Sequence, residues 1–186
     1  MKNLQPIKSL LFVLLCSVCI TSCTKDDINV DTTSISVNLK STIGRLDKVY
    51  MNIIDVQLKI KETSNAEDWL SLNMINQGTH DVSNLSEDSP LLLVDNLEIE
   101  ASYIYEIRLV LGENNFIDIN NILHSLETSS LGNATPSNII NTELSSKRRY
   151  DIVIDVDIDE SVSFNEQENM MVLNPKLYTA IRQIEY

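Results

Sequence analysis

Residues 103–111 read YIYEIRLVL, and this stretch decides the fold class. Apolar or aromatic side chains occur at every second position, and the polar Glu106 and Arg108 lie between them. A period of two is typical of a β-strand that buries one face and exposes the other. The pattern therefore predicts a strand whose core face consists of Tyr103, Tyr105, Ile107, Leu109 and Leu111.

The same period recurs on both sides of this stretch. For residues 50–60, it predicts a core face made of Tyr50, Ile54, Val56, Leu58 and Ile60. Other short strand candidates are 35–39, 69–72, 116–119, 139–144, 150–158, 170–173 and 177–184. Residues 91–94 are a continuous apolar run that could be a strand or one helical turn. There are only four glycines, so the turns between strands must rely on asparagine and serine. About nine short strands without a long helix predict an all-β protein with a single antiparallel β-sandwich.

Several of these segments also resemble a known family in the same order along the chain. Residues 105–112, YEIRLVLG, look like its "Tyr, any, Ile-Arg-Leu" strand. The family is domain-of-unknown-function family 4382, found in lipoproteins of the Bacteroidetes. Further matching segments are 49–56, 69–72, 150–161 and 172–176. The resemblance implies a transthyretin-like or carbohydrate-binding-module-like sandwich and no activity. The chain departs from the family at Ile43-Gly44-Arg45 and at Asn174.

The first 22 residues are expected to be an export signal and not part of the fold. Lys2 and Lys8 precede an apolar run, 10–20, that is shorter than the roughly 20 residues of a membrane-spanning helix. Ile20-Thr21-Ser22-Cys23 resembles a bacterial lipobox, in which the cysteine thiol takes a diacylglycerol. Each buried methylene of such chains contributes about 0.8 kcal/mol to membrane binding. Cys23 is therefore the expected lipidation site, and an ordinary signal peptide is the alternative.

Residues 23–32 are expected to form an acylated, flexible tether, and residues 33–186 the sandwich. In the tether, Lys25, Asp26 and Asp27 resemble the signal that sends Bacteroidetes lipoproteins to the outer face of the outer membrane. A solvated tether without such a signal is the alternative. Asp31-Thr32-Thr33 resembles an O-glycan acceptor of the same phylum, with Thr32 as the modified residue.

Charge and cysteine content exclude several classes of protein. The net charge is −13, and it becomes −15 once residues 1–22, with two lysines, are removed. Nucleic acids and anionic membrane surfaces need a basic partner, so neither is an expected ligand. All three cysteines lie within residues 1–23, so no disulfide is expected in the sandwich. A hydrophobic core must hold the fold.

An acidic row is the candidate metal site. If residues 150–159 form one regular strand, Asp151, Asp155, Asp157 and Asp159 share a face. Carboxylate oxygens are the ligands of Ca²⁺, which takes 6–8 of them. Calcium at Asp155, Asp157 and Asp159 is therefore the candidate cofactor, and a solvated strand face is the alternative. No other cofactor is indicated.

Trp69 is the candidate ligand-binding residue, because an exposed aromatic ring can stack on a sugar; core packing is the alternative. No catalytic motif is found: there is no nucleophile elbow, phosphate loop, zinc signature or dinucleotide fingerprint. We therefore expect a non-enzymatic lipoprotein on the outer membrane, anchored through Cys23, that acts as a binding or adhesion module for glycans or a protein ligand. The alternative is a fimbrial or envelope-assembly subunit that is joined by strand addition.

Overall fold

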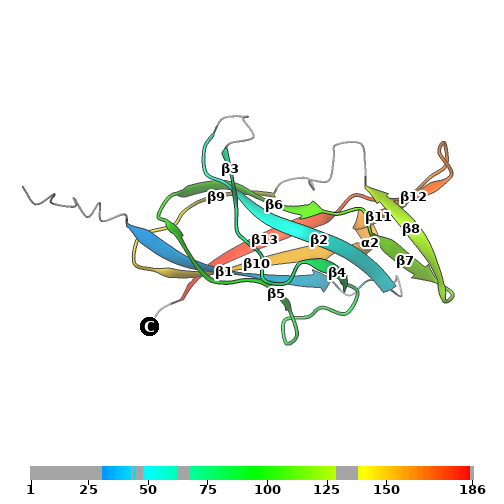
Figure 1. The fold of residues 1–186 in the computed structure, drawn as a ribbon, viewed down its shortest axis with the longest axis horizontal. Helices are drawn as coiled ribbons and strands as arrows, with labels where there is room; N and C mark the ends of the chain where they lie inside the picture. The colour runs from blue at the N-terminus through cyan, green and yellow to red at the C-terminus, as the bar shows by residue number, and fades with distance from the viewer. Residues whose placement is uncertain (1–30, 43, 45–47, 63–67, 129–137, 185–186) are drawn as a thin grey trace, which may run out of the picture. The chain divides into compact units, whose positions relative to one another are not determined.

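The computed structural model describes residues 31–42, 44, 48–62, 68–128 and 138–184 (Figure 1). The chain divides into two units, residues 1–30 and residues 31–186, and the description below concerns the second unit. The predicted anchor and export residues, Cys23, Lys25, Asp26 and Asp27, lie outside the described residues. None of the helices in the described ranges is long and apolar enough to cross a membrane.

Two sheets make up the second unit (Figure 1). The four-stranded sheet has the order β13 (Lys176–Ile184), β10 (Arg149–Asp157), β1 (Thr32–Thr42) and β5 (Leu91–Glu100). The nine-stranded sheet has the order β11 (Val162–Asn165), β12 (Met170–Leu173), β8 (Ile122–Thr128), β7 (Phe116–Ile119), β2 (Lys48–Lys59), β6 (Tyr103–Leu111) and β9 (Asn138–Glu143). β3 (Trp69–Ser71) and β4 (Gly78–Asp81) also pair with β2. A short helix, α2 (Ile158–Ser161), follows β10.

The all-β sandwich predicted from the sequence is confirmed, but its sheets are mixed and not purely antiparallel. β1 runs parallel to β10, and β12 runs parallel to β8. Short hairpin turns force antiparallel pairing, whereas parallel neighbours need a long connection. Most of the nine-stranded sheet lies between β1 and β10 in the sequence, so this pair is free to be parallel.

The core lies between the two sheets and is built from alternate residues of their strands. In β10 the alternation is regular: Tyr150, Ile152, Ile154 and Val156 are buried. Complete burial of an aliphatic side chain contributes about 1.5–3 kcal/mol. The largest fully buried side chains are Ile35, Leu39, Met51, Ile53, Leu58, Leu72, Leu93, Ile104, Ile107, Leu109, Leu111 and Ile117.

β2 departs from the predicted alternation. One step along β6 corresponds to two steps along β2 between Ile53 and Asp55, which is a β-bulge. The extra residue reverses the facing of the strand, so Val49, Met51 and Ile53 are buried before it. The prediction that Tyr50 and Ile54 face the core was therefore wrong: Tyr50 is only half-buried, and Ile54 is 40% exposed.

Asparagine takes the backbone conformations that glycine usually takes in tight turns, as expected for a chain with few glycines. Among the described residues other than glycine, seven have a positive φ, and all except Lys147 are asparagines. Asparagine tolerates this left-handed region better than other side chains do. Asn120 and Asn121, both with positive φ, form the two-residue turn between β7 and β8.

Candidate functional site

Where β6 pairs out of register with β9, the alternation of β6 breaks and two tyrosines lie on the outside of the nine-stranded sheet. Two steps along β6, from Ile104 to Glu106, correspond to three steps along β9. Both Ile104 and Ile107 are buried, although they are three residues apart, so the residues on either side of Ile104 point outward. Tyr103 is 40% exposed, and its ring centroid lies 4.8 Å from that of Tyr105. The prediction that both tyrosines face the core was therefore wrong.

Trp69 lies on the same outer face, two strands away. Across the sheet, Trp69 of β3 is paired with Lys59 of β2, which is paired with Glu106 of β6. Neighbouring strands are about 4.8 Å apart, so Trp69 and Glu106 are separated by about 10 Å. Ile139 of β9 continues this row and is 70% exposed. We call the surface formed by Trp69, Tyr103, Tyr105 and Ile139, with the polar side chains between them, the aromatic face.

A network of polar contacts holds Trp69 in place. The guanidinium carbon of Arg108 lies 3.8 Å from the centroid of the Trp69 ring, a cation–π contact. Nε and Nη2 of Arg108 donate to Oε1 of Gln57 at 2.9 and 2.7 Å. Nε2 of Gln57 in turn donates to Asp55 at 2.9 Å, and the hydroxyl of Ser71 donates to the same carboxylate at 2.9 Å. Burial lowers the pKa of Arg108, while Glu106 and Asp55 oppose that shift.

The ionised groups of the aromatic face balance one another. Lys59 forms a salt bridge of 2.7 Å with Glu106, and Arg108 and Asp55 are linked through Gln57. Two acids and two bases therefore lie in this network, in a chain whose net charge is −13. A ligand approaching this network meets no net charge, although the protein as a whole repels anions.

The acidic row ends at Asp157, two residues before Asp159. β10 stops at Asp157, whose carboxylate caps α2 by accepting the N–H of Glu160 at 3.1 Å. Asp159 lies within α2, so the prediction that it continues the strand face was wrong. Asp155 accepts the hydroxyl of Thr42 at 3.1 Å. Among the described residues, no group of three or more His, Cys, Asp or Glu side chains could hold a metal ion.

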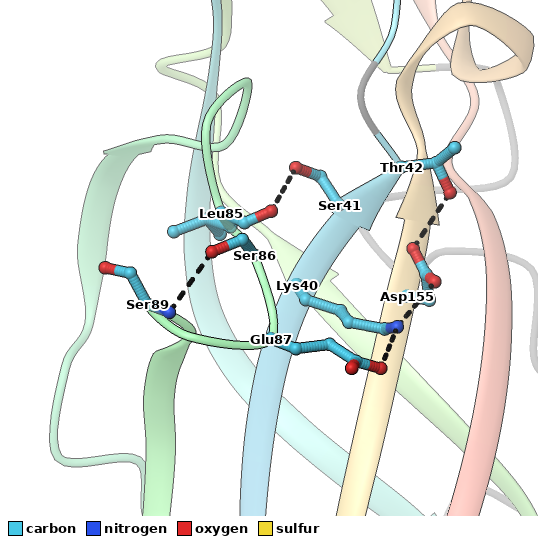
Figure 2. Close-up of polar contacts among 8 residues, drawn as sticks. All are labelled: Lys40, Ser41, Thr42, Leu85, Ser86, Glu87, Ser89 and Asp155. Carbon is cyan, nitrogen blue, oxygen red and sulfur yellow. Dashed lines mark hydrogen bonds and ion pairs between the residues drawn. The ribbon is translucent and has the colours of Figure 1, made fainter.

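Asp155 takes part in an ion-pair cluster on the outside of the four-stranded sheet (Figure 2). Nζ of Lys40 lies 3.1 Å from Glu87 and 3.3 Å from Asp155. Figure 2 shows that Glu87 comes from the loop before β5, and Ser41 donates its N–H and hydroxyl to Leu85 O of that loop at 3.2 and 3.1 Å. These contacts fasten the loop to β1.

A polar groove of about 340 Å³ lies beside this cluster, lined partly by Asn38, Lys40, Asp151 and Arg182. Several of its polar groups bond to one another: Nδ2 of Asn38 donates to Asp151 at 2.8 Å, and Lys40 is held by Glu87 and Asp155. Side chains that satisfy each other across strands stabilise the sheet, so we assign the groove mainly a structural role.

The Lys40–Glu87 pair predicts a pH dependence. The hydrogen bond to Lys40 lowers the pKa of Glu87, and the bond to Glu87 raises the pKa of Lys40. The stabilisation by Glu87 is present above the usual carboxyl pKa of about 4.3 and is lost as the pH falls through the lowered value. The stabilisation by Lys40 is present below the usual lysine pKa of about 10.4 and is lost as the pH rises through the raised pKa of Lys40.

We therefore expect the loop to loosen in acid. The protection factor of the Ser41 amide, which donates to the loop, should fall between pH 5 and pH 3 in the wild type. In Glu87→Gln it should be lower at pH 5 and should change less over this interval. Equal acid sensitivity of the wild type and this variant would show that other carboxylates control the loop.

The structure does not bring the sequence-predicted site residues together. Trp69 lies on the nine-stranded sheet, whereas Asp155 and Asp157 lie on the four-stranded sheet. Thr32 is the first residue of β1 and is exposed, so it is accessible to modification. The tyrosines of the aromatic face were missed as site residues. The one signal in the sequence was the aromatic pair Tyr103 and Tyr105 itself.

A comparison with protein families matches residues 29–175 to the family described as "Domain of unknown function (DUF4382)". The chain belongs to the DUF4382 family. The match covers nearly all of the sandwich, including β2, β3 and β6, which carry most of the aromatic face. Searches of the curated proteins and of the solved structures gave no match. For this DUF4382 chain, function must therefore be argued from the site.

Proposed function

We propose that the protein is a surface-displayed, non-catalytic binding module that takes glycans on its aromatic face. The observation that carries the proposal is the break in the alternation of β6 beside β9, where Tyr103 and Tyr105 face outward on the side of the sheet that also carries Trp69. Exposed aromatic side chains and arginine are enriched among residues that dominate binding energy. Their large rings offer contact area at a small cost in conformational entropy.

The chemistry of the face favours a neutral sugar chain. The apolar side of a sugar ring can lie on the tyrosine rings, while its hydroxyls can donate to carboxylates and accept from nitrogen donors. The balanced charges of Asp55, Lys59, Glu106 and Arg108 favour an uncharged ligand, because the net charge of −13 would repel uronic acids or sulfated sugars.

The cellular place of the protein is part of the proposal. The lipobox-like segment ending at Cys23 and the following Lys25-Asp26-Asp27 support an anchor in the outer membrane of a bacterium of the Bacteroidetes, on its outer side. A tether between the anchor and the sandwich would leave the outer face of each sheet open to large ligands. In this setting Thr32 is the proposed O-glycan site.

Glycan binding should depend on the aromatic face. Tyr103→Ala removes an exposed ring without opening the core, so binding to a neutral oligosaccharide identified on a glycan array should weaken about tenfold or more. Trp69→Ala should weaken it as well, because it also releases Arg108. The measurement is isothermal titration calorimetry with the oligosaccharide that gives the strongest array signal.

Tyr178→Ala is the matched control. This tyrosine is 51% exposed, but it lies on β13 of the four-stranded sheet. Its replacement should leave glycan affinity unchanged within about twofold. The proposal fails if no neutral glycan binds, or if Tyr178→Ala weakens binding as much as Tyr103→Ala does.

A further inference from the structure

β5 is an edge strand, and the described residues cover its open side over only the first half of its length. In the first half, the N–H of Ile75 donates to Leu93 O at 3.0 Å, and Nδ2 of Asn76 donates to Leu92 O at 2.8 Å. Over the second half, Leu97–Glu100, β1 is the only strand among the described residues that pairs with β5. An edge of this kind is a template for pairing with another strand.

The register shows which backbone groups point to the open side. The N–H of Ala101 donates to Asp31 O at 2.8 Å, and Thr33 is paired with Ile99 in the same register. In an antiparallel pair, alternate residues bond inward and the residues between them point away. The backbone groups of Glu98 and Glu100 are therefore directed away from β1, and Glu100 O also accepts the hydroxyl of Ser102 at 3.2 Å.

A notch between the two sheets lies beside this open half. It has a volume of about 280 Å³. Its apolar walls come from both sheets: Leu97 and Ile99 belong to β5, Leu70 to β3, and Ile60 follows β2. Glu98 and Glu100 also line it. The outward backbone groups of β5 thus lie next to the apolar wall of the notch, and strand addition uses both kinds of surface.

The path of residues 69–76 explains why the described part of the chain covers only the first half of the edge. β3 has only three residues, and Leu72 still donates its N–H to Val56 O of β2 at 3.0 Å. Asn73 then takes a left-handed conformation with φ of 48°, and by Ile75 the chain bonds to β5. The segment therefore crosses from one sheet to the other at Asn73, which itself lines the notch.

We propose that the open half of β5 accepts an extended segment of a basic partner protein by strand addition. Apolar side chains at alternate positions of that segment enter the notch, and lysine or arginine residues between them face Glu98 and Glu100. A second copy of this chain is a poor occupant, because two molecules of net charge −13 repel each other. The surface differs from the aromatic face, so this inference does not rest on glycan binding.

The test uses the full-length protein and a capped seven-residue peptide that alternates lysine with valine. Titration followed by NMR should show binding, with slower amide exchange at Glu98 and Glu100. A peptide of the same composition in two blocks, and one that alternates glutamate with valine, should bind at least about tenfold more weakly. Binding of the alternating lysine peptide should also weaken as salt is raised.

Two variants of Glu98 distinguish the contribution of its backbone N–H to peptide binding from that of its carboxylate. Glu98→Ala removes the carboxylate and keeps the outward N–H, so the affinity should fall about two- to threefold. Glu98→Pro also removes the N–H, at an edge position where proline does not disturb the bond to β1, and the affinity should fall about tenfold further.

Three outcomes would overturn the inference. The alternating lysine peptide could fail to bind at millimolar concentration, or it could protect amides elsewhere and leave Glu98 and Glu100 unchanged. Protection of these two amides that rises with protein concentration in the absence of peptide would identify a second copy as the occupant. If Glu98→Pro does not fold, the amide exchange of the wild type, measured with each of the three peptides, still tests whether the peptide pairs with Glu98 and Glu100.

Discussion

Replacing Asn115 by alanine should lower the free energy of unfolding by about 2–4 kcal/mol, although the change removes only an amide group. Asn115 is 1% exposed. Its Oδ1 accepts the N–H of Asn52 at 2.8 Å, and its Nδ2 donates to Gly112 O at 2.8 Å. Alanine leaves the buried Gly112 carbonyl and the partly buried Asn52 N–H without these partners. A buried group left unpaired costs about 1–3 kcal/mol, and a partly buried one costs less. The measurement is urea unfolding followed by circular dichroism.

The adjacent Asn114 provides the control. Its side chain is exposed, and its contact with Thr79 is made through the backbone carbonyl, so Asn114→Ala should change stability by less than about 0.5 kcal/mol. For a chain of this length, the loss in Asn115→Ala corresponds to a fall in Tm of roughly 4–16 °C. Equal stability of the two variants would mean that water replaces the lost amide.

Asn115 illustrates what a sequence pattern contains and what it lacks. Gly112-Glu113-Asn114-Asn115 is recognisable as a turn, because glycine and asparagine favour turn conformations. Nothing in the pattern distinguishes Asn115 from Asn114. The difference arises only when β2 is placed beside the turn, so that Asn52 presents its N–H to the buried amide. A contact between residues 63 positions apart is not encoded in a local period.

The period of two predicted the sandwich well where strands are regular and failed at register shifts. In β10, the buried residues are the ones that alternation predicts. In β2 and β6, a shift near Ile54 and another near Tyr105 reverse the facing of part of each strand. A reversal moves every later side chain to the other face, so one unrecognised shift misplaces several residues.

The same cause limited the prediction of the candidate site. Trp69 was singled out as an aromatic residue to test, and its half-burial beneath Arg108 fits both ligand binding and packing. Tyr103 and Tyr105 were assigned to the core by alternation, so the aromatic face could not be assembled from the sequence. Asp159 was assigned to a strand because a four-residue helix leaves no periodic signal.

Changing Cys23 to serine should remove the protein from the membrane almost completely. The lipobox-like sequence places a thiol at the position where a diacylglycerol would be attached, and serine offers no thiolate for that reaction. Several acyl chains at about 0.8 kcal/mol per buried methylene hold a protein stably, whereas a single chain does so only marginally. We therefore expect the wild type in the outer-membrane fraction and the variant in the periplasmic or secreted fraction.

Labelled palmitate provides the direct measurement, and the other cysteines provide the control. Cys16→Ser and Cys19→Ser lie within the expected signal peptide, so both variants should incorporate label as the wild type does. Incorporation that persists in Cys23→Ser would contradict the lipobox assignment. Replacing Lys25, Asp26 and Asp27 by alanine should leave the label unchanged but reduce the access of an external protease to the sandwich. The proposed anchor and the proposed export signal can thus be tested separately, and the proposed capture of glycans at the cell surface requires both.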